Sequence, residues 1–323
     1  MLNRIPRMAM ALAAAIACAA PSAAHAEYPD RPIKLVLPFP PGGETDPLAR
    51  RIFGEVSKAL GQPIVIENRP GANGAIAFEA VARAPKDGYT LLMGFSYMLV
   101  VNPHIYQKLP YTFEDFAPIS LLAEGQYVLV VNPSLPVHDT RGLIDYLKAN
   151  PGKLNYGSSG IGGAPHMAGE LLMARTDTKM VHIPFSGGGL AATSLMAGDI
   201  QVLFASPVVL APLIKAGKVR GLAVTGSTRL DILPDLPTLS EALPGLQVTA
   251  WHSLLAPAGT PQPVLDRLNA ELMKALASSE VRDQTAQQGL RIVSSTPAEV
   301  RERVRTESAM WGDVIRKAGI TAQ

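Results

Sequence analysis

Short runs of β-branched and aliphatic residues alternate with longer segments of helical periodicity from residue 27 onward. Most of the short runs are continuously apolar, as expected for strands that are buried on both faces. This alternation is typical of parallel sheets covered by helices. The predicted strands are 33–37, 64–66, 90–93, 127–131, 154–156, 180–183, 200–204, 219–224 and 248–255. The predicted helices between them are 47–60, 76–84, 140–150, 164–174, 190–197 and 208–216, several of which end at a glycine such as Gly198 or Gly217.

The C-terminal part is predicted to be mostly helical, with one short strand. A helix begins at Thr260 and Pro261 and carries an apolar stripe at helical spacing. Thr296 to Glu299 form a capping box that opens the last helix, which continues to Ile315. The stripe is interpreted as core, and it consists of Val264, Leu268, Leu272 and Leu276.

The N-terminus has the pattern of a secretory signal peptide. Arg4 and Arg7 precede an uncharged stretch over 8–20, and Ala24-His25-Ala26 form an A-x-A cleavage site. We therefore predict removal of residues 1–26 and export of the mature chain to the periplasm. The alternative is lipid attachment at Cys18, which the better cleavage site at Ala26 disfavours.

Leader removal changes the charge and the thiol content of the 323-residue chain. Loss of Arg4 and Arg7 leaves 27 basic residues against 27 acidic ones, so the mature formal charge is zero. This balance gives no reason to expect binding to nucleic acid or to an anionic membrane surface. Cys18 is the only cysteine, so the mature chain has no disulfide and no cysteine nucleophile. No later segment is long and apolar enough to span a bilayer.

The length and the apolar content predict two α/β domains. With 47% hydrophobic and 17% charged residues, the chain is neither disordered nor fibrous. The segments 119–131 and 248–255 are the most apolar and are expected to cross between domains, side by side, as a hinge. The predicted first domain is therefore discontinuous, formed by 27–125 and 250–323, and the second is inserted as 126–249.

Three glycine-rich loops each lie between a predicted strand and a predicted helix. They cover 38–47, 157–166 and 183–189. Glycines before a helix start let backbone N–H groups approach an anion, which the helix dipole also favours. Open α/β sheets bind ligands at the carboxyl ends of their strands. The loops therefore predict a site for a small anionic ligand, although each loop alone is also compatible with a simple tight turn.

Motifs for catalysis are incomplete in this sequence. Ile161 replaces the last glycine of a nucleophile elbow, and Pro165 replaces the last glycine of a dinucleotide fingerprint. The mature histidines show no helical pair at metal spacing and are interpreted as structural, with His166 in the second loop as the exception to watch. We expect a binding protein that is not an enzyme and has no cofactor or metal site.

Several motifs, taken in order along the chain, resemble the extracytoplasmic solute receptors of tripartite tricarboxylate transporters, also called Bug receptors. They are PFPPGGETDPLAR at 38–50, IENRPGANG at 66–74, DGYTLL at 87–92, YGSSGIGGAPHMAGE at 156–170 and the segment 182–204. The resemblance covers essentially the whole mature chain. It implies a class II periplasmic binding protein fold, in which two α/β domains joined by two crossover strands close on a small carboxylate. It also implies delivery of that ligand to an integral-membrane permease.

The resemblance also implies which residues contact the ligand. The first ligand loop corresponds to Gly42, Gly43, Glu44, Thr45 and Asp46, and the loop of the inserted domain to Ser158, Ser159, Gly160 and Gly162. A third wall corresponds to Phe185, Gly187 and Gly188, while Ser96 and Ser206 follow strands that point into the cleft.

Two departures from the family pattern bear on the ligand. Glu44 stands where the family usually has a small residue, and 95–101 (FSYMLVV) is bulkier and more apolar than usual. A carboxylate beside the anion site would repel a plain dicarboxylate, while Phe95, Met98 and Phe185 would suit an apolar body. We therefore expect a monomeric receptor for an amino acid or another monocarboxylate rather than citrate. The alternatives are a receptor coupled to a sensor kinase and, as a rival class, a periplasmic enzyme on a similar two-domain fold.

Overall fold

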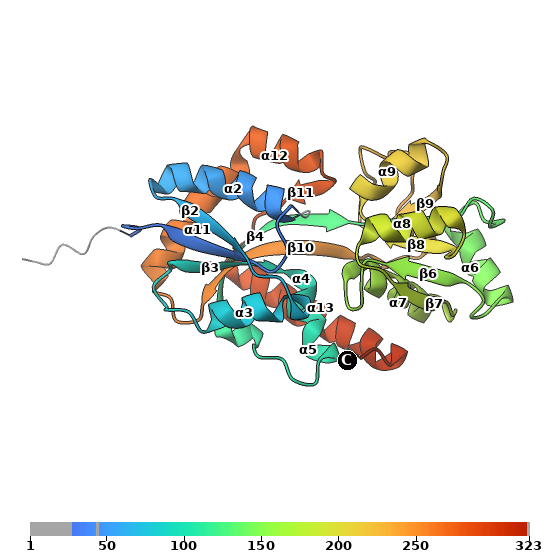
Figure 1. Cartoon of the computed structure of the whole chain (residues 1–323), viewed down its shortest axis with the longest axis horizontal. Helices are drawn as coiled ribbons and strands as arrows, with labels where there is room; N and C mark the ends of the chain where they lie inside the picture. Colours follow the sequence, from blue (N-terminus) through green and yellow to red (C-terminus); the bar gives the residue numbers. More distant parts are fainter. Residues whose placement is uncertain (1–27, 43–44, 322–323) are drawn as a thin grey trace, which may run out of the picture.

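Two β-sheets, each with helices on both faces, make up the computed structural model of the chain (Figure 1). The structure describes residues 28–42 and 45–321. The predicted leader, Cys18, Gly43 and Glu44 therefore lie outside the described residues. We call the sheet that contains the first strand, together with its helices, the first lobe. The other sheet and its helices form the second lobe.

The first lobe contains a mixed six-stranded sheet in the order β11-β4-β10-β3-β1-β2. β1 is parallel to β2 and β3, whereas β10 is antiparallel to both of its neighbours. The prediction of purely parallel sheets is therefore wrong, because β10 and β11 re-enter this sheet from the far end of the chain. The strands are β1 (Ile33–Leu37), β2 (Ile64–Asn68), β3 (Thr90–Phe95), β4 (Phe116–Gln126), β10 (Thr249–Pro257) and β11 (Leu290–Ile292).

Helices bury both faces of this sheet, which explains why its strands are continuously apolar. Leu35 of β1 lies in the core on one face, and its neighbour Val36 lies in the core on the other, as the alternation of a strand requires. The first face packs on α2 (Thr45–Leu60), α11 (Gln262–Ala277) and α12 (Ser279–Ala286). The second face packs on α3 (Ala75–Ala82), α4 (Ser96–Val100), α5 (Asn102–Ile105) and α13 (Pro297–Ala318).

The second lobe contains a five-stranded mixed sheet in the order β7-β6-β8-β5-β9. β6 is parallel to β7 and β8, while β5 is antiparallel to β8 and β9. Its strands are β5 (Val128–Val131), β6 (Asn155–Ser158), β7 (Val181–Pro184), β8 (Val202–Ala205) and β9 (Arg220–Val224). Its helices are α6 (Thr140–Ala149), α7 (Ala164–Thr176), α8 (Gly188–Ala197), α9 (Pro207–Lys215) and the short α10 (Leu239–Ala242).

The chain crosses between the lobes at two neighbouring points. It leaves the first lobe between Gln126, the last residue of β4, and Val128, the first residue of β5. It returns at Thr249 of β10, which pairs directly with Gln126. Thr225 connects the two crossings, because its backbone N–H donates to the Tyr127 carbonyl at 2.8 Å and its carbonyl accepts from the Val248 N–H at 2.8 Å. The two crossings are therefore joined both by strand pairing and by the backbone of Thr225.

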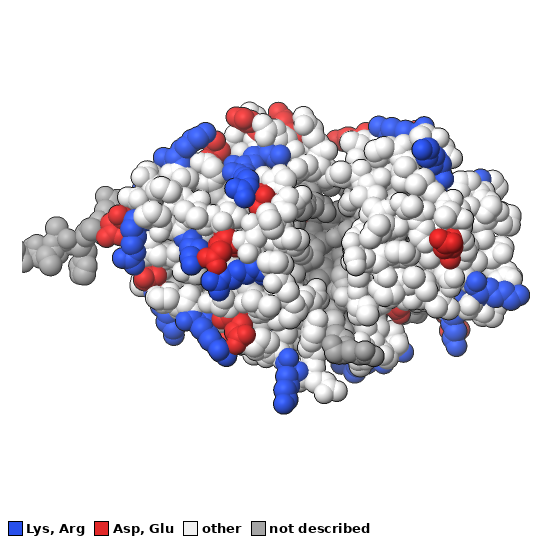
Figure 2. All heavy atoms as spheres, viewed as in Figure 1, with Lys and Arg blue, Asp and Glu red and all other residues white. Residues whose placement is uncertain are grey.

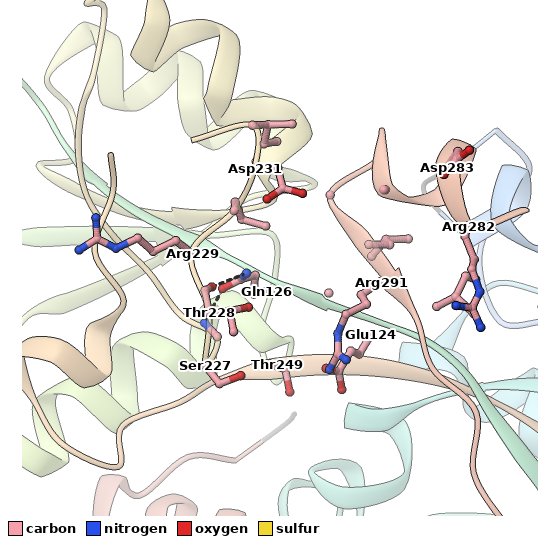
Figure 3. A pocket seen from close by; sticks show the side chains of 18 residues that line it. Glu124, Gln126, Ser227, Thr228, Arg229, Asp231, Thr249, Arg282, Asp283 and Arg291 are labelled. Carbon is pink, nitrogen blue, oxygen red and sulfur yellow. Dashed lines mark hydrogen bonds and ion pairs between the residues drawn. The ribbon is translucent and has the colours of Figure 1, made fainter. Parts of the chain in front are cut away.

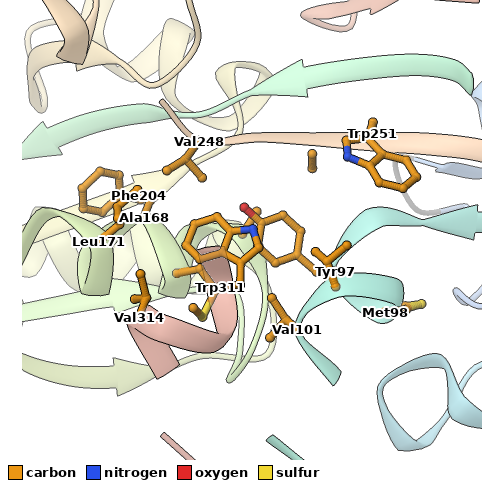
Figure 4. Close-up of a cluster of buried hydrophobic side chains, with 14 of the residues drawn as sticks. Tyr97, Met98, Val101, Ala168, Leu171, Phe204, Val248, Trp251, Trp311 and Val314 are labelled. Atoms are coloured by element: carbon orange, nitrogen blue, oxygen red, sulfur yellow. The ribbon is translucent and has the colours of Figure 1, made fainter. Parts of the chain in front are cut away.

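One apolar cluster continues from the first lobe into the second (Figure 4). Trp311 of α13 is 2% exposed, and its ring lies 5.6 Å from that of Tyr97 in α4. The same helix contacts α7 of the second lobe, where Ala168 and Leu171 belong to the same cluster. The C-terminal helix therefore packs against both lobes at once.

The helix ends follow the sequence signals closely. The Thr296 hydroxyl accepts from the Glu299 N–H at 3.2 Å, and the Glu299 carboxylate accepts from the Thr296 N–H at 2.7 Å, which confirms the capping box. Gly198 ends α8 in the left-handed conformation with a φ of 89°. The stripe of α11 is buried at Leu268, Leu272 and Leu276. The short helices α4 and α5 were not predicted, because α4 is buried along its whole length and neither helix is long enough to show an amphipathic period.

Candidate functional site

A cavity of 660 Å³ lies between the two lobes, above the crossing strands. None of the described residues that line it is Lys, Arg, Asp or Glu. In Figure 2 the groove between the two lobes has walls that are almost entirely uncharged, while the charged side chains lie on the outer surfaces. A ligand in this cavity would therefore meet backbone groups, hydroxyls, amides and apolar side chains.

The first lobe contributes the loop between β1 and α2. Gly42 and Thr45 line the cavity, and Gly42 has a φ of 77°, which favours glycine. The Thr45 hydroxyl lies 3.3 Å from Nε2 of His252, which is 4% exposed. Burial lowers the pKa of His252 to about 4, so its ring is neutral at neutral pH. Nδ1 of this ring has no hydrogen-bond partner among the residues that the structure describes.

Asp46 follows Thr45 but does not line the cavity. Its carboxylate accepts from Arg50 at 3.0 Å and 3.3 Å and from Asn68 at 3.4 Å. These bonds, that from Arg50 foremost, lower the pKa of Asp46 below its usual value. Asp46 is therefore an ionised residue of the first helical turn, paired away from the cavity.

The second lobe contributes the loop between β6 and α7. Ser159, Gly160 and Gly162 line the cavity. A Cβ on Gly162 would lie 2.6 Å from Cδ1 of Ile105 in the first lobe, so a glycine lets the two lobes approach here. Ser158 does not reach the cavity, since it is fully buried and bonds to His182 and Gly160 beneath the loop.

Some of the remaining predicted residues line the cavity, and the others do not. Gly188 and Ser206 line the cavity at the N-terminal ends of α8 and α9. Phe185 packs against the apolar core of the second lobe, and Gly187 is the N-cap of α8. Ser96 is fully buried, and its hydroxyl accepts from the Trp251 N–H at 3.2 Å. The structure does not bring Ser96, Phe185 or Gly187 to the cavity, because each is taken up by local packing or capping.

Among the described elements, four helices of nine or more residues begin at the wall of this cavity. Thr45 is the first residue of α2, Ala164 of α7 and Gly188 of α8, while Ser206 is the N-cap of α9. Each helix N-terminus carries about half a positive charge and unpaired N–H groups. Their convergence makes the cavity suited to an anion even though it has no cationic side chain.

The apolar part of the wall comes mainly from aromatic residues of the first lobe. The ring of Phe95 lies 5.4 Å from that of Phe39 and 5.1 Å from that of His252. Tyr97 and Met98 continue this wall. Among these, Phe39, Tyr97 and His252 were not predicted, although Phe39 lies in the same PFPPGG loop as the first glycine pair and could have been inferred from it. Gln126 and Tyr127 line the cavity as well, and their position at the crossing was the available signal.

A second cavity of 510 Å³ flanks the crossing and shares Gly125, Gln126 and Leu290 with the first (Figure 3). Its charged residues are largely paired with one another or with neighbours. Glu124 forms ion pairs with Arg291 and, at 3.1 Å, with Arg303, and Arg229 pairs with Glu241 at 2.9 Å. This cavity therefore lacks the uncharged, N–H-rich wall that characterises the first.

Two further properties of the described residues bear on the class of protein. They contain no group of three or more His, Cys, Asp or Glu side chains placed to hold a metal ion. None of the helices in the described ranges is long and apolar enough to cross a membrane.

Comparison with known proteins gives one consistent result. Residues 48–320 match the family described as tripartite tricarboxylate transporter family receptor. Protein BugT of Bordetella pertussis is 35% identical over 295 residues, which cover 90% of each chain.

Solved structures agree with this match. Rpa4515 of R. palustris with adipate is 34% identical, with a TM-score of 0.80 over 91% of this chain and 99% of that one. MatC of Rhodopseudomonas palustris with bound malate is 35% identical, with a TM-score of 0.76 over 89% of this chain and all of that one. The periplasmic binding protein BugD is 32% identical, with a TM-score of 0.77 over 92% of this chain and all of that one. The predicted α/β periplasmic binding protein fold is thereby confirmed.

Proposed function

Because this chain belongs to the tripartite tricarboxylate transporter receptors, a family of periplasmic solute-binding proteins without enzymatic activity, we propose the ligand class and the site that it uses. The ligand is a small carboxylate with an aliphatic or aromatic body, bound in the 660 Å³ cavity between the lobes. The protein binds it as a monomer and delivers it to the integral-membrane permease subunits of the transporter.

The convergence of four helix N-termini on an uncharged cavity carries this proposal. The termini of α2, α7, α8 and α9 supply N–H donors and partial positive charge for a carboxylate. In the same cavity, Phe39, Phe95 and Met98 offer an apolar wall for the body of the ligand. Adipate and malate are bound by the related proteins Rpa4515 and MatC, which supports a carboxylate as the ligand class.

We further propose that fewer carboxylates than the three of citrate are accommodated. Each ionised carboxylate transferred from water needs compensating charge or hydrogen bonds, and no Lys or Arg is among the described lining residues. The sequence position of Glu44, next to Thr45, adds a carboxylate to this loop and favours a ligand with a donor group, such as an amino acid. A monocarboxylate with an apolar body and a donor group fits these conditions best.

A ligand screen on the mature protein, residues 27–323, tests this proposal. Calorimetry and thermal unfolding are compared for citrate, malate, adipate, benzoate and phenylalanine. A ligand at a hundredfold excess over Kd stabilises the folded state by about 2.7 kcal/mol, so a true ligand raises Tm measurably. We expect phenylalanine or benzoate to bind more tightly than citrate, and Glu44→Gly to reduce the preference for phenylalanine. Tightest binding of citrate, or no response to any of the acids, would contradict the proposal.

A further inference from the structure

Two histidines stack beneath the ligand loop 157–163 of the second lobe. The rings of His166, from α7, and His182, from β7, have centroids 3.9 Å apart and are inclined by 21°. Tyr156 lies against the pair, with its ring 4.8 Å from that of His182, and donates its hydroxyl to Glu170 at 2.6 Å. His166 is 4% exposed and His182 is half-buried, so the pair belongs to the floor under the loop.

His166 holds the loop through one backbone group. The Gly162 N–H donates to Nδ1 of His166 at 3.0 Å. Nδ1 therefore carries no proton, and the single ring proton sits on Nε2, which lies 3.6 Å from Oε1 of Glu170. A second proton on this ring would replace the acceptor by a donor and break the bond to Gly162.

His182 holds the loop through Ser158. The Ser158 hydroxyl donates to the Gly160 carbonyl at 3.0 Å and accepts from the Gly160 N–H at 3.2 Å. Since the hydroxyl proton is directed at this carbonyl, the 2.7 Å bond between Ser158 Oγ and His182 Nε2 is donated by the ring N–H. One serine and one histidine thus fix both backbone polar groups of Gly160.

These bonds leave alternate backbone donors of the loop available. The N–H groups of Gly160 and Gly162 are engaged below the loop. Within the described part of the chain, the N–H groups of Ser159, Ile161 and Gly163 have no partner, and all three residues line the cavity. Gly160 and Gly162 have φ angles of 134° and 75°, so the alternation depends on a backbone that only glycine adopts readily.

We propose that His166 and His182 are positioning residues that hold the loop so that the N–H groups of Ser159, Ile161 and Gly163 face the ligand carboxylate. This inference rests on the proposed function, because it names how one wall of that site is kept ready for an anion. Neither histidine touches the ligand; each acts through the backbone of the loop.

The charge state of His182 makes the position of the loop depend on pH. Burial, and next the proximity of His166, lower the pKa of His182 to about 4, while Glu170 acts in the opposite direction. The groups that face the pair are Ser158 and Tyr156 on β6 and Glu170 on α7. His182 is therefore neutral near pH 7, and acidification toward pH 4 puts a positive charge on this half-buried ring, which disfavours its stacked arrangement against His166 beneath the loop. Ligand affinity therefore falls in that range.

Matched variants separate the polar role from the packing role. Asn supplies an acceptor close to the position of Nδ1, and Gln supplies a donor close to that of Nε2, while Phe keeps a flat ring without either. The test pairs are His166→Asn with His166→Phe, and His182→Gln with His182→Phe. The exposed His138, changed to Phe, is the control.

The first readout needs no ligand. Hydrogen–deuterium exchange of the peptide that spans 157–163 is compared with that of β5 in the same protein. We expect the Phe variants at 166 and 182 to speed exchange of the loop at least fivefold while β5 is unchanged, and the Asn and Gln variants and His138→Phe to match wild type. Loop exchange unchanged in both Phe variants overturns the proposal. If a Phe variant does not fold, the wild-type loop must lose protection relative to β5 between pH 7 and pH 4, and equal protection of both overturns the proposal.

The second readout is the affinity for the tightest-binding acid of the five in the screen above. We expect at least tenfold weaker binding in the Phe variants, at most threefold in the Asn and Gln variants, and a pH dependence below pH 5 that His182→Gln reduces. Faster loop exchange with unchanged affinity overturns the role in binding. If none of the five acids binds wild type, the proposed function fails, and the exchange experiment alone then decides whether the histidines position the loop.

Discussion

At the scale of single residues, the two serines of the second loop have different roles. Ser158 is fully buried under the loop, and Ser159 lines the cavity. Ser158→Ala removes the partner of the half-buried His182 and of Gly160, so we expect a loss of about 1–3 kcal/mol in unfolding free energy. Ser159→Ala is expected to leave stability within about 0.5 kcal/mol and, because this hydroxyl lies at the cavity wall, to weaken ligand binding by about 1.5–3 kcal/mol. Chemical denaturation and calorimetry on both variants measure the two effects, and equal stability of both variants would contradict the assignment.

His252 makes the stability of the protein depend on pH. Its pKa is about 4 in the folded protein, against the usual value of 6.5. Between these values the unfolded chain binds more protons than the folded one, so stability is fully present above pH 6.5 and is lost as the pH falls toward 4. The full loss corresponds to about 3 kcal/mol. Urea denaturation from pH 7 to pH 4 should show this slope, and His252→Gln should reduce it. An unchanged slope in the variant would assign the acid sensitivity to other groups.

The sequence could predict some residues of the candidate site, but not whether each side chain lines the cavity or is buried beneath it. The local pattern predicted glycine-rich loops before helix starts, and the family resemblance implied Thr45, Ser159 and Gly162 within them, all of which line the cavity. Ser158 differs from Ser159 only in being the last residue of a strand, which turns its side chain toward the floor instead of the cavity. His252 reaches the cavity because it lies on β10, which pairs with β3 and β4. These pairings join residues more than a hundred positions apart in the sequence, so no local pattern predicts them.

At the scale of elements, α13 packs against both lobes, which its amphipathic pattern did not predict. The capping box predicted where the helix begins, and the apolar spacing predicted that one face is buried. The pattern could not distinguish burial against one lobe from burial against two. Trp311 shows the difference, because it lies beside Tyr97 of α4 in a cluster that continues to Leu171 of α7.

Truncation of Trp311 tests the importance of this contact. Trp311→Ala is expected to lower the free energy of unfolding by about 3–5 kcal/mol, since it leaves a large cavity in a continuous core. Met310, on the same helix, is 39% exposed, and Met310→Ala should change stability by less than about 1 kcal/mol. Denaturant unfolding monitored by circular dichroism gives both values. A small effect of Trp311→Ala would mean that the two lobes do not depend on this helix.

At the scale of the whole molecule, two opposing features determine how far the lobes move. The paired crossings at Gln126 and Thr249 allow bending, as the sequence predicts for two adjacent connections. The core shared through α13 lies across the same junction and resists it. We therefore expect a small closure of the cavity on ligand binding instead of a wide rotation.

Distance measurement by electron spin resonance can detect this closure. Residues 27–323 contain no cysteine, so in a protein of that span spin labels can be introduced at Lys58→Cys on α2 and Lys215→Cys on α9, both exposed positions on opposite lobes. A ligand that raises Tm should shift and narrow the distance distribution. Trp311→Phe, which reduces the contact with the shared core, should broaden the distribution of the ligand-free protein. Identical distributions with and without the ligand would refute closure.

The chain leaves the first lobe at one crossing and returns to it at the other, and this path determines the order in which the lobes can fold as the chain emerges from export. β5 to β9 lie between residues 128 and 224, so the second sheet can be completed as soon as that stretch is available. The first sheet cannot, because β10, which separates β3 from β4, begins only at Thr249. Until β10 arrives, β3 and β4 present open strand edges, which are prone to pair with other chains. The lobe that begins the sequence is thus the last to be finished, and its long-range pairing is the step at which folding competes with aggregation.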